Sequence, residues 1–489
     1  MNDHRAHWKR SREIVERIVV TGDLVLLSPT HLGSGDADSP TAMSLLLDPL
    51  TGTEPLLTGT SVAGALRNYL RERKHGYGYS LTVEEESHSS VGLLFGGQRG
   101  DPEGEQSLLI VDDARSKAAD IEVRDGVRID PKTRTAKVDE VHGRKRGYKF
   151  DLELLQAGIK FPLRFELLVP EGKSQALKSA LAQALWGLEQ DEIPLGARKR
   201  RGFGRCEVEN WRVISYDLKT KVGLLAWLEG DESGAAEGPR IADLLEVEVD
   251  KDDQRSRFSI QATFQLDGSM LIRSGFGESD TGPDMVHLHS HRPGRGRVPV
   301  LPGTSLAGVI RHRALCIVNT LAADGAGQKL VDAMFGRGPT EEDDTLTASR
   351  ILVNETVIEG TRSLVQSRVK IDRFTGGAFP TALFTEQPIF GGPDSCVTVE
   401  LVLRNPGRHE IGLLLLVLKD LCTGDLPIGG GSSVGRGRLI GTKTELSVRG
   451  PDIKRRWTLK QSRDTVEVTG DDTRLLEEYV QALLEEVQR

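Results

Sequence analysis

The sequence predicts an α+β protein with two tandem copies of one β-α-β-β-α-β domain, followed by a C-terminal helix. The first observation is length, because 489 residues exceed what a single compact core usually holds. The second is an internal repeat, since GTSVAGALR at 59–67 returns as GTSLAGVIR at 303–311. The third is that strand and helix periodicities follow one another in the same order in both halves.

Four further blocks return in the same order along the chain. FG at 95–96 returns at 335–336, and the apolar run at 107–111 returns at 349–353. VRID at 127–130 returns as VKID at 369–372. IPLG with GFGR at 193–205 returns as LPIG with GRGR at 426–438. Collinear matches over roughly 150 residues are typical of a tandem duplication. We therefore expect a first domain at 1–225, an acidic linker at 226–256, a second domain at 257–445 and a C-terminal extension at 446–489.

Residue periodicity predicts the elements of each domain. Alternating, β-branched segments at 19–27 and 259–272 predict the opening strands. A helix is expected after each GTS, capped by Thr60 and Ser61 or by Thr304 and Ser305. Further strands and helices are expected at 108–111, 161–168, 176–188, 397–403 and 409–421. This order is typical of the ferredoxin-like, RRM-type sandwich, and 473–489 has the spacing of an amphipathic helix that docks on a core or on a partner.

Composition argues against several classes of protein. A net charge of −8 disfavours a protein that coats nucleic acid with its whole surface, although basic residues gather in four glycine-containing segments at 142–147, 198–205, 292–297 and 435–438. No apolar stretch reaches the roughly 18 residues of a membrane-spanning helix, and the first residues lack a signal-peptide core, so we expect a cytoplasmic protein with no membrane contact. The four cysteines form no C-x-x-C pair, which disfavours disulfides and a cysteine zinc site.

The two GTS helix starts suit a phosphate. Backbone N–H groups, the hydroxyls of Thr60, Ser61, Thr304 and Ser305, and the positive end of the helix dipole meet there. Arg67 and Arg311 follow on the same helices as bidentate donors. The alternative is ordinary helix capping beside an exposed arginine.

The glycine-rich loops are the sharper signal. Their cations are Arg198, Lys199, Arg200, Arg201 and Arg205 in the first copy and Arg436 and Arg438 in the second. Neither loop ends in the GK[ST] of a P-loop, so they suit a polynucleotide backbone better than a nucleoside triphosphate. Because aromatic residues make up only 5%, base stacking is not expected to dominate. The alternative for these loops is a flexible, solvated turn.

The combination of G-T-S-x-x-G-x-x-R, V-x-I-D and a terminal G-x-G-R resembles the RAMP superfamily, specifically a fused tandem backbone subunit of a type III (III-D-like) CRISPR RNA-guided effector complex. The resemblance implies RRM-like palms that grip a CRISPR guide RNA, and β-hairpin thumbs near 127–136 and 369–378 that interrupt its duplex with target RNA. Arg128, Lys370 and Arg373 would lie beside that duplex. It also implies other type III effector subunits as partners.

The resemblance further implies cleavage of target RNA by an aspartate in the loop before the GTS helix, with a divalent metal ion such as Mg²⁺ as cofactor. Asp284 occupies that position in the second copy. When the two loops are aligned on the glycine that begins each of them, Ala42 corresponds to Asp284. When they are aligned on the GTS, Pro40 corresponds to it, and neither residue has a carboxylate. We therefore expect the first copy to be impaired unless Asp38 or Asp36 substitutes.

Four histidines lie near these loops. His287, His289 and His291 alternate, so on one strand they would share a face and could bind a metal, act in acid–base chemistry or contact RNA phosphate. His31 is expected to be structural or to face RNA.

Three functions compete. The first is an RNA-guided endoribonuclease acting through Asp284, which would serve antiviral defence. The second is a non-catalytic RNA-binding scaffold of the same kind of complex. The third is an enzyme that binds a small nucleotide in its glycine-rich loops.

Overall fold

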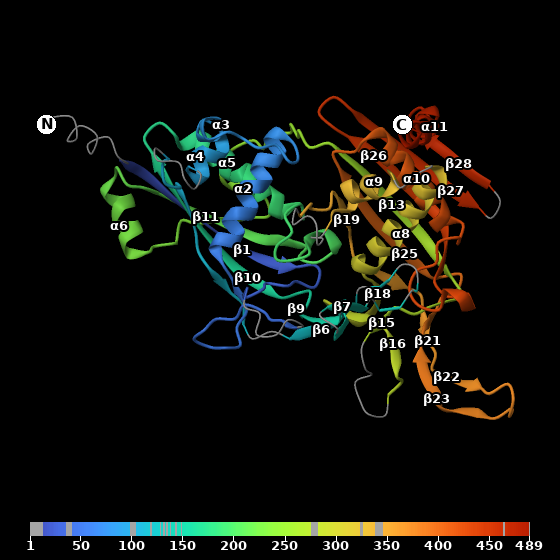
Figure 1. The fold of residues 1–489 in the computed structure, drawn as a ribbon. Coiled ribbons are helices and arrows are strands. Elements are labelled where there is room, and N and C mark those ends of the chain that lie inside the picture. The colour runs from blue at the N-terminus through green and yellow to red at the C-terminus, as the bar shows by residue number, and fades with distance from the viewer. Residues whose placement is uncertain are drawn as a thin grey trace.

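A computed structural model describes residues 13–35, 42–97, 104–117, 120–127, 129–130, 133, 135–136, 138–141, 144–147, 149–274, 282–322, 326–337, 346–462 and 465–488. It contains two α+β modules that lie side by side, the first in blue to green and the second in yellow to red (Figure 1). The predicted α+β class is confirmed. Among the described helices, none is long and apolar enough to cross a membrane.

The first module is an antiparallel sheet covered by helices. Its strand order is β12-β11-β1-β10-β4, formed by Ala236–Gly238, Cys206–Asp217, Ile14–Leu26, Lys160–Pro170 and Leu109–Val111. One face packs against α2 (Gly59–His75), α4 (Ser90–Phe95) and α5 (Ser174–Glu189), with the short helices α3 (Val83–Ser87) and α7 (Ile241–Leu244) beside them. Strand β1 alternates: Ile18 and Val20 enter this core, whereas Val19 packs on the other face against α6 (Lys221–Glu229).

The second module repeats this arrangement and extends it. Its sheet runs β17-β18-β20-β25-β13-β26-β27-β28, with β19 also pairing β25. These strands are His289–Arg292, Gly296–Leu301, Thr356–Glu359, Cys396–Arg404, Arg257–Asp267, Arg438–Arg449, Lys454–Ser462, Thr465–Gly470 and, for β19, Ile351–Val353. The helices are α8 (Gly303–Leu321), α9 (Ala326–Phe335), α10 (Arg408–Cys422) and α11 (Arg474–Val487). The amphipathic tail is therefore a helix, and it docks through Tyr479 and Leu483 on its own core.

A hairpin insertion lies beside each sheet. In the first module β2 (Ala42–Met43), β6 (Ile121–Val127) and β9 (Lys149–Leu155) form it, with β7 (Val138–Val141) and β8 (Arg144–Gly147). In the second, β15 (Arg273–Ser274), β16 (Met285–His287), β22 (Gln366–Ile371) and β23 (Ala378–Gln387) form it, and β22–β23 projects away from the body (Figure 1). The bridge Ile129–Ala136 matches the pair Ile371–Ala378, which places both expected thumb segments within these insertions.

Short strands complete the structure. They are β3 (Leu56–Leu57) with β5 (Ala114–Arg115), and β14 (Ser269–Met270), β24 (Ile389–Phe390) and β21 (Arg362–Ser363). The segment expected to be an acidic linker is folded against the first module. Its strand β12 pairs with β11, Ile241 is fully buried, and Asp250 forms an ion pair with Lys74.

The two modules share a buried, polar interface. The carboxylate of Glu355, from the second module, pairs with Arg124 of the first and with Arg292. Ser290 donates a hydrogen bond to Glu122 across the same interface at 3.0 Å. A Cβ added to Gly202 would collide with the backbone of Glu355, so the glycine-rich loop of the first module lies directly on the second.

Candidate nucleic-acid interface and catalytic loop

The basic loop of the first module is a single 3-10 turn, η1 (Lys199–Arg201), between two left-handed residues. Arg198 has φ 56° and Gly202 has φ 88°. The second copy has the same shape, because Gly431 and Gly435 flank η2 (Ser432–Val434) with φ 78° and 81°. Backbone hydrogen bonds from Ala197 to His31 and from Gly204 to Pro29 fix the first loop against the sheet. The glycines therefore make the same left-handed, hydrogen-bonded turn in both copies.

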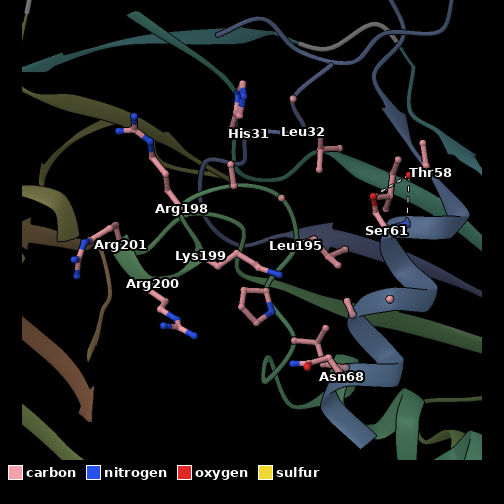
Figure 2. A pocket seen from close by; sticks show the side chains of 18 of the residues that line it. His31, Leu32, Thr58, Ser61, Asn68, Leu195, Arg198, Lys199, Arg200 and Arg201 are labelled. Carbon is pink, nitrogen blue, oxygen red and sulfur yellow. Dashed lines mark hydrogen bonds between the residues drawn. The ribbon is translucent and has the colours of Figure 1, made fainter. Parts of the chain in front are cut away.

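A cavity of about 1170 Å³ opens beside this loop. Its walls come from the start of α2, the loop itself, the segments 31–35, 43–46 and 56–57 of the first module, and residues of the second module. They include Thr58, Thr60, Ser61 and Asn68; Arg198, Lys199, Arg200 and Arg201; and Ser349, Leu352 and Arg404. Figure 2 shows the four cationic side chains spreading from one turn, with α2 on the opposite side. The cavity is thus complete only when both modules are present.

The four cations form no direct ion pair within the described residues, although Glu72 in the same cavity raises the pKa of Lys199 and Arg200 from a longer distance. One guanidinium nitrogen each of Arg200 and Arg201 is buried without a hydrogen-bond partner among the residues that the structure describes. Burial lowers the pKa of Arg198, Lys199, Arg200 and Arg201, and Arg404 lowers the pKa of Lys199 and Arg200 further. Arg198 also lies over the ring of Phe150, at 4.2 Å from its centre. Such a cluster favours a polyanion.

The two GTS helix starts differ. In α2 the N-cap is Thr58, not Thr60 or Ser61 as expected, and Thr58 accepts a hydrogen bond from the Ser61 N–H at 3.3 Å. The hydroxyls of Thr60 and Ser61 contact Thr58 at the cavity wall.

In α8 the N-cap is Pro302, and a Cβ on Gly303 would collide with the backbone oxygen of Arg201. Thr304 and Ser305 therefore lie beside the loop of the first module.

Arg67 and Arg311 have an intramolecular role. Arg67 pairs with Glu86 and donates to the Gly96 carbonyl oxygen at 3.2 Å. Arg311 pairs with Asp332 and donates to the Gly336 carbonyl oxygen at 2.9 Å. Each arginine thus ties its helix to the repeated Phe-Gly turn, which explains its recurrence without RNA.

The remaining loop arginines divide into exposed and buried side chains. Arg436 is only 3% exposed and bonds Glu386 and Gln366, so the expectation that it contacts RNA from a loop rim is corrected: burial gives its guanidinium an internal partner. Arg205 pairs with Asp191, outside the large cavity. Arg438 is exposed at the first residue of β26.

The projecting hairpin carries exposed cations at the expected positions. Lys370 lies over the Phe379 ring at 4.7 Å, and Arg373 lies in the exposed turn between β22 and β23. Large exposed apolar side chains accompany them, Phe374 being 91% exposed. Arg128, predicted at the matching place in the first module, is outside the described residues.

Asp284 lies at the exposed start of β16, beside β23. The backbone N–H of Thr385 donates to its Oδ2 at 2.6 Å, and the Thr385 hydroxyl lies 3.0 Å from the same oxygen. These bonds, led by the backbone one, hold the pKa of Asp284 below its usual value. Strand register aligns Met285 with Met43, because Met285 pairs with Glu386 as Met43 pairs with Leu152, and Ala42 therefore stands in the first copy where the second has Asp284. Asp36 and Asp38 are outside the described residues.

The alternating histidines do not form one face. His287 is 1% exposed; its Nδ1 accepts from the Ile272 N–H and its Nε2 contacts the Val300 carbonyl oxygen, both at 3.2 Å. The strand breaks at Leu288, so His289 and His291 belong to β17, where they contact the carbonyl oxygens of His287 and Ala157. His31 is also buried and bonds the Glu153 carbonyl oxygen at 2.8 Å. The prediction that the three alternating histidines share one face was wrong, because it assumed that they lie on one unbroken strand.

No group of three or more histidine, cysteine, aspartate or glutamate side chains is arranged to hold a metal in the described part of the chain. The only metal ligand that Asp284 itself can provide is its exposed carboxylate. Mg²⁺ commonly binds one or two carboxylates together with substrate phosphates and water. The described part of this loop therefore fits a metal that Asp284 shares with RNA.

Sequence reasoning missed Thr385, Glu386, Arg404 and the Arg124–Glu355 pair. Their partners are distant in sequence, and no local pattern marks them.

The family profile of the RAMP superfamily matches residues 23–207 and 263–440, which is most of both modules. A search of curated proteins found no match. The chain belongs to the RAMP superfamily, with one matched region in each half.

Proposed function

We propose that the chain is a tandem backbone subunit of a type III CRISPR effector complex, with RRM-like modules that bind guide RNA and a second module that cleaves the paired target RNA. RAMP domains are associated with CRISPR effector complexes. The observation that carries the proposal is the cavity in which four cations form no direct ion pair within the described residues. A guide-RNA backbone would supply the missing negative charge.

Asp284 supports the proposed cleavage. Asp284 is exposed and, as an aspartate, ionised at neutral pH, so its carboxylate can accept the proton of a ribose 2′-hydroxyl. That hydroxyl would attack the adjacent phosphate and form a cyclic phosphate, and the departing 5′-oxygen would take a proton from water. A divalent metal ion would supply positive charge at the phosphate when bound, and Asp284 is the residue that would hold it.

Binding is tested with labelled single-stranded RNA over a range of salt. We compare the Lys199→Gln, Arg200→Gln, Arg201→Gln triple variant with a charge-matched control on β27, Lys454→Gln, Arg455→Gln, Arg456→Gln. Loss of three phosphate contacts should flatten the slope of log affinity against log salt by roughly 2, and the control should not change it. Equal slopes in the two variants would contradict the RNA-binding proposal. Stoichiometric binding of an ATP analogue without RNA would favour the small-nucleotide enzyme.

Cleavage is tested in a complex assembled on guide RNA. Asp284→Asn keeps the size of the side chain and removes its charge. The proposal expects one cut to disappear while target binding persists. The scaffold alternative, favoured by the lack of a carboxylate at the corresponding position of the first copy, expects unchanged cutting.

A further inference from the structure

Asp284 is oriented by a strand that is far away in sequence. Thr385 of β23 lies 101 residues from Asp284 and meets it with both backbone and side chain. The Asp284 N–H donates to the Thr385 hydroxyl oxygen at 3.0 Å. That hydroxyl and the Thr385 N–H in turn donate to Oδ2. A reciprocal pair of this kind holds both the backbone and the carboxylate of Asp284.

The bonds from Thr385 all go to one carboxylate oxygen. Oδ2 is therefore engaged, and Oδ1 of this exposed side chain, which accepts no hydrogen bond from Thr385, can accept a proton or a cation from a ligand.

Strand β23 is itself anchored at this point. Glu386, next to Thr385, is 3% exposed and pairs with Arg436 at 2.8 Å and with Arg368 at 3.0 Å. Arg436 comes from the glycine-rich loop, so the strand beside Asp284 is fixed to the module body. A carboxylate held by such a strand loses rotamer freedom before substrate binds.

The first module lacks this arrangement. Its strands β2 and β9 pair in parallel as β16 and β23 do, and Lys149 pairs with Val127 as Leu383 pairs with Val369, so the register aligns Asp151 with Thr385. Asp151 has no hydroxyl. In sequence, Ala42 stands where the second copy has Asp284. The aspartate and its hydroxyl partner are thus both missing from the same copy.

We propose that Thr385 is a positioning residue that fixes the Asp284 carboxylate for reaction with RNA. The inference rests on the proposed function, since it assumes that Asp284 acts on a phosphodiester. Thr385 acts through Asp284 and does not itself touch the reacting atoms.

The test compares Thr385→Val, which removes only the hydroxyl, with Thr385→Ser, which restores it. Single-turnover cleavage and target affinity are measured on the assembled complex. Thr469→Val, on the exposed strand β28, is the matched control. We expect Thr385→Val to slow cleavage roughly 10- to 100-fold with unchanged affinity, Thr385→Ser to recover most of the rate, and the control to match the parent.

Two results would overturn the inference: cleavage by Thr385→Val at the parent rate, or no recovery in Thr385→Ser. Asp284→Asn separates these from failure of the proposed function. If Asp284→Asn abolishes the cut and Thr385→Val does not slow it, only the positioning role is lost. If Asp284→Asn cleaves normally, the proposed cleavage itself is wrong.

Discussion

Arg124 of the first module and Glu355 of the second form an ion pair whose carboxylate is completely buried. Arg292 donates to the other carboxylate oxygen at 2.6 Å. Burial raises the pKa of Glu355, but the neighbouring Arg124 and Arg292 outweigh this effect and hold that pKa below its usual value. The pair joins the hairpin base of the first module to the segment before β20 in the second, so it bears directly on how the two modules are held together.

We expect Glu355→Gln to lower the free energy of unfolding by about 3–5 kcal/mol, because two buried guanidinium groups lose their counter-charge. The matched control is Glu359→Gln on β20, whose pair with Arg295 is about half exposed, and it should cost less than about 1 kcal/mol. Urea unfolding measures both. Equal losses would show that the interface does not depend on this charge.

Gly202→Ala and Gly435→Ala test the same interface from the backbone. Both positions have positive φ, so both variants strain the turn. Only at Gly202 would the added Cβ strike the second module, whereas Gly435 faces open space. Gly202→Ala should lower the free energy of unfolding further than Gly435→Ala, by about 1–3 kcal/mol more, and the melting temperature should fall accordingly. Identical shifts would place the loop away from Glu355.

His287 predicts a pH dependence of stability. Burial, followed by the charge of His289, lowers its pKa to about 4. The unfolded chain takes up a proton below about pH 6.5, and the folded chain does not until about pH 4, so stability falls as pH drops through this window. The loss between pH 7 and pH 5 should be up to about 2 kcal/mol. His287→Gln should weaken this dependence of the free energy of unfolding on pH, as measured by urea titrations at several pH values. His289→Gln should leave the dependence steep.

Arg67→Gln and Arg311→Gln test the structural reading of the repeated helix arginine. Glu86, the partner of Arg67, is 2% exposed, and Asp332, the partner of Arg311, is 18% exposed. We therefore expect a loss of about 2 kcal/mol for Arg67→Gln and about 1 kcal/mol for Arg311→Gln. RNA affinity should stay unchanged in both. A drop in affinity without a drop in stability would restore the phosphate-binding interpretation.

Much of the fold could be predicted from local sequence. The glycines at 202 and 435 recur because a left-handed turn needs a residue without a Cβ, and Tyr479 and Leu483 keep helical spacing because α11 buries one face. The Arg198–Arg201 cluster was visible for the same reason, since its members are consecutive. Arg436 looked equivalent in sequence, but burial beside Glu386 gave it another role.

The sequence by itself determined the internal repeat, the α+β class and the place of the basic loop, because periodicity, turn residues and repeats are local properties. Only the tertiary structure decided which residues meet: Thr385 with Asp284, Arg124 with Glu355, and the second module with the cavity of the first. Such contacts join segments separated by 101 or 231 residues. They depend on how whole sheets pack, and no short stretch of sequence encodes that.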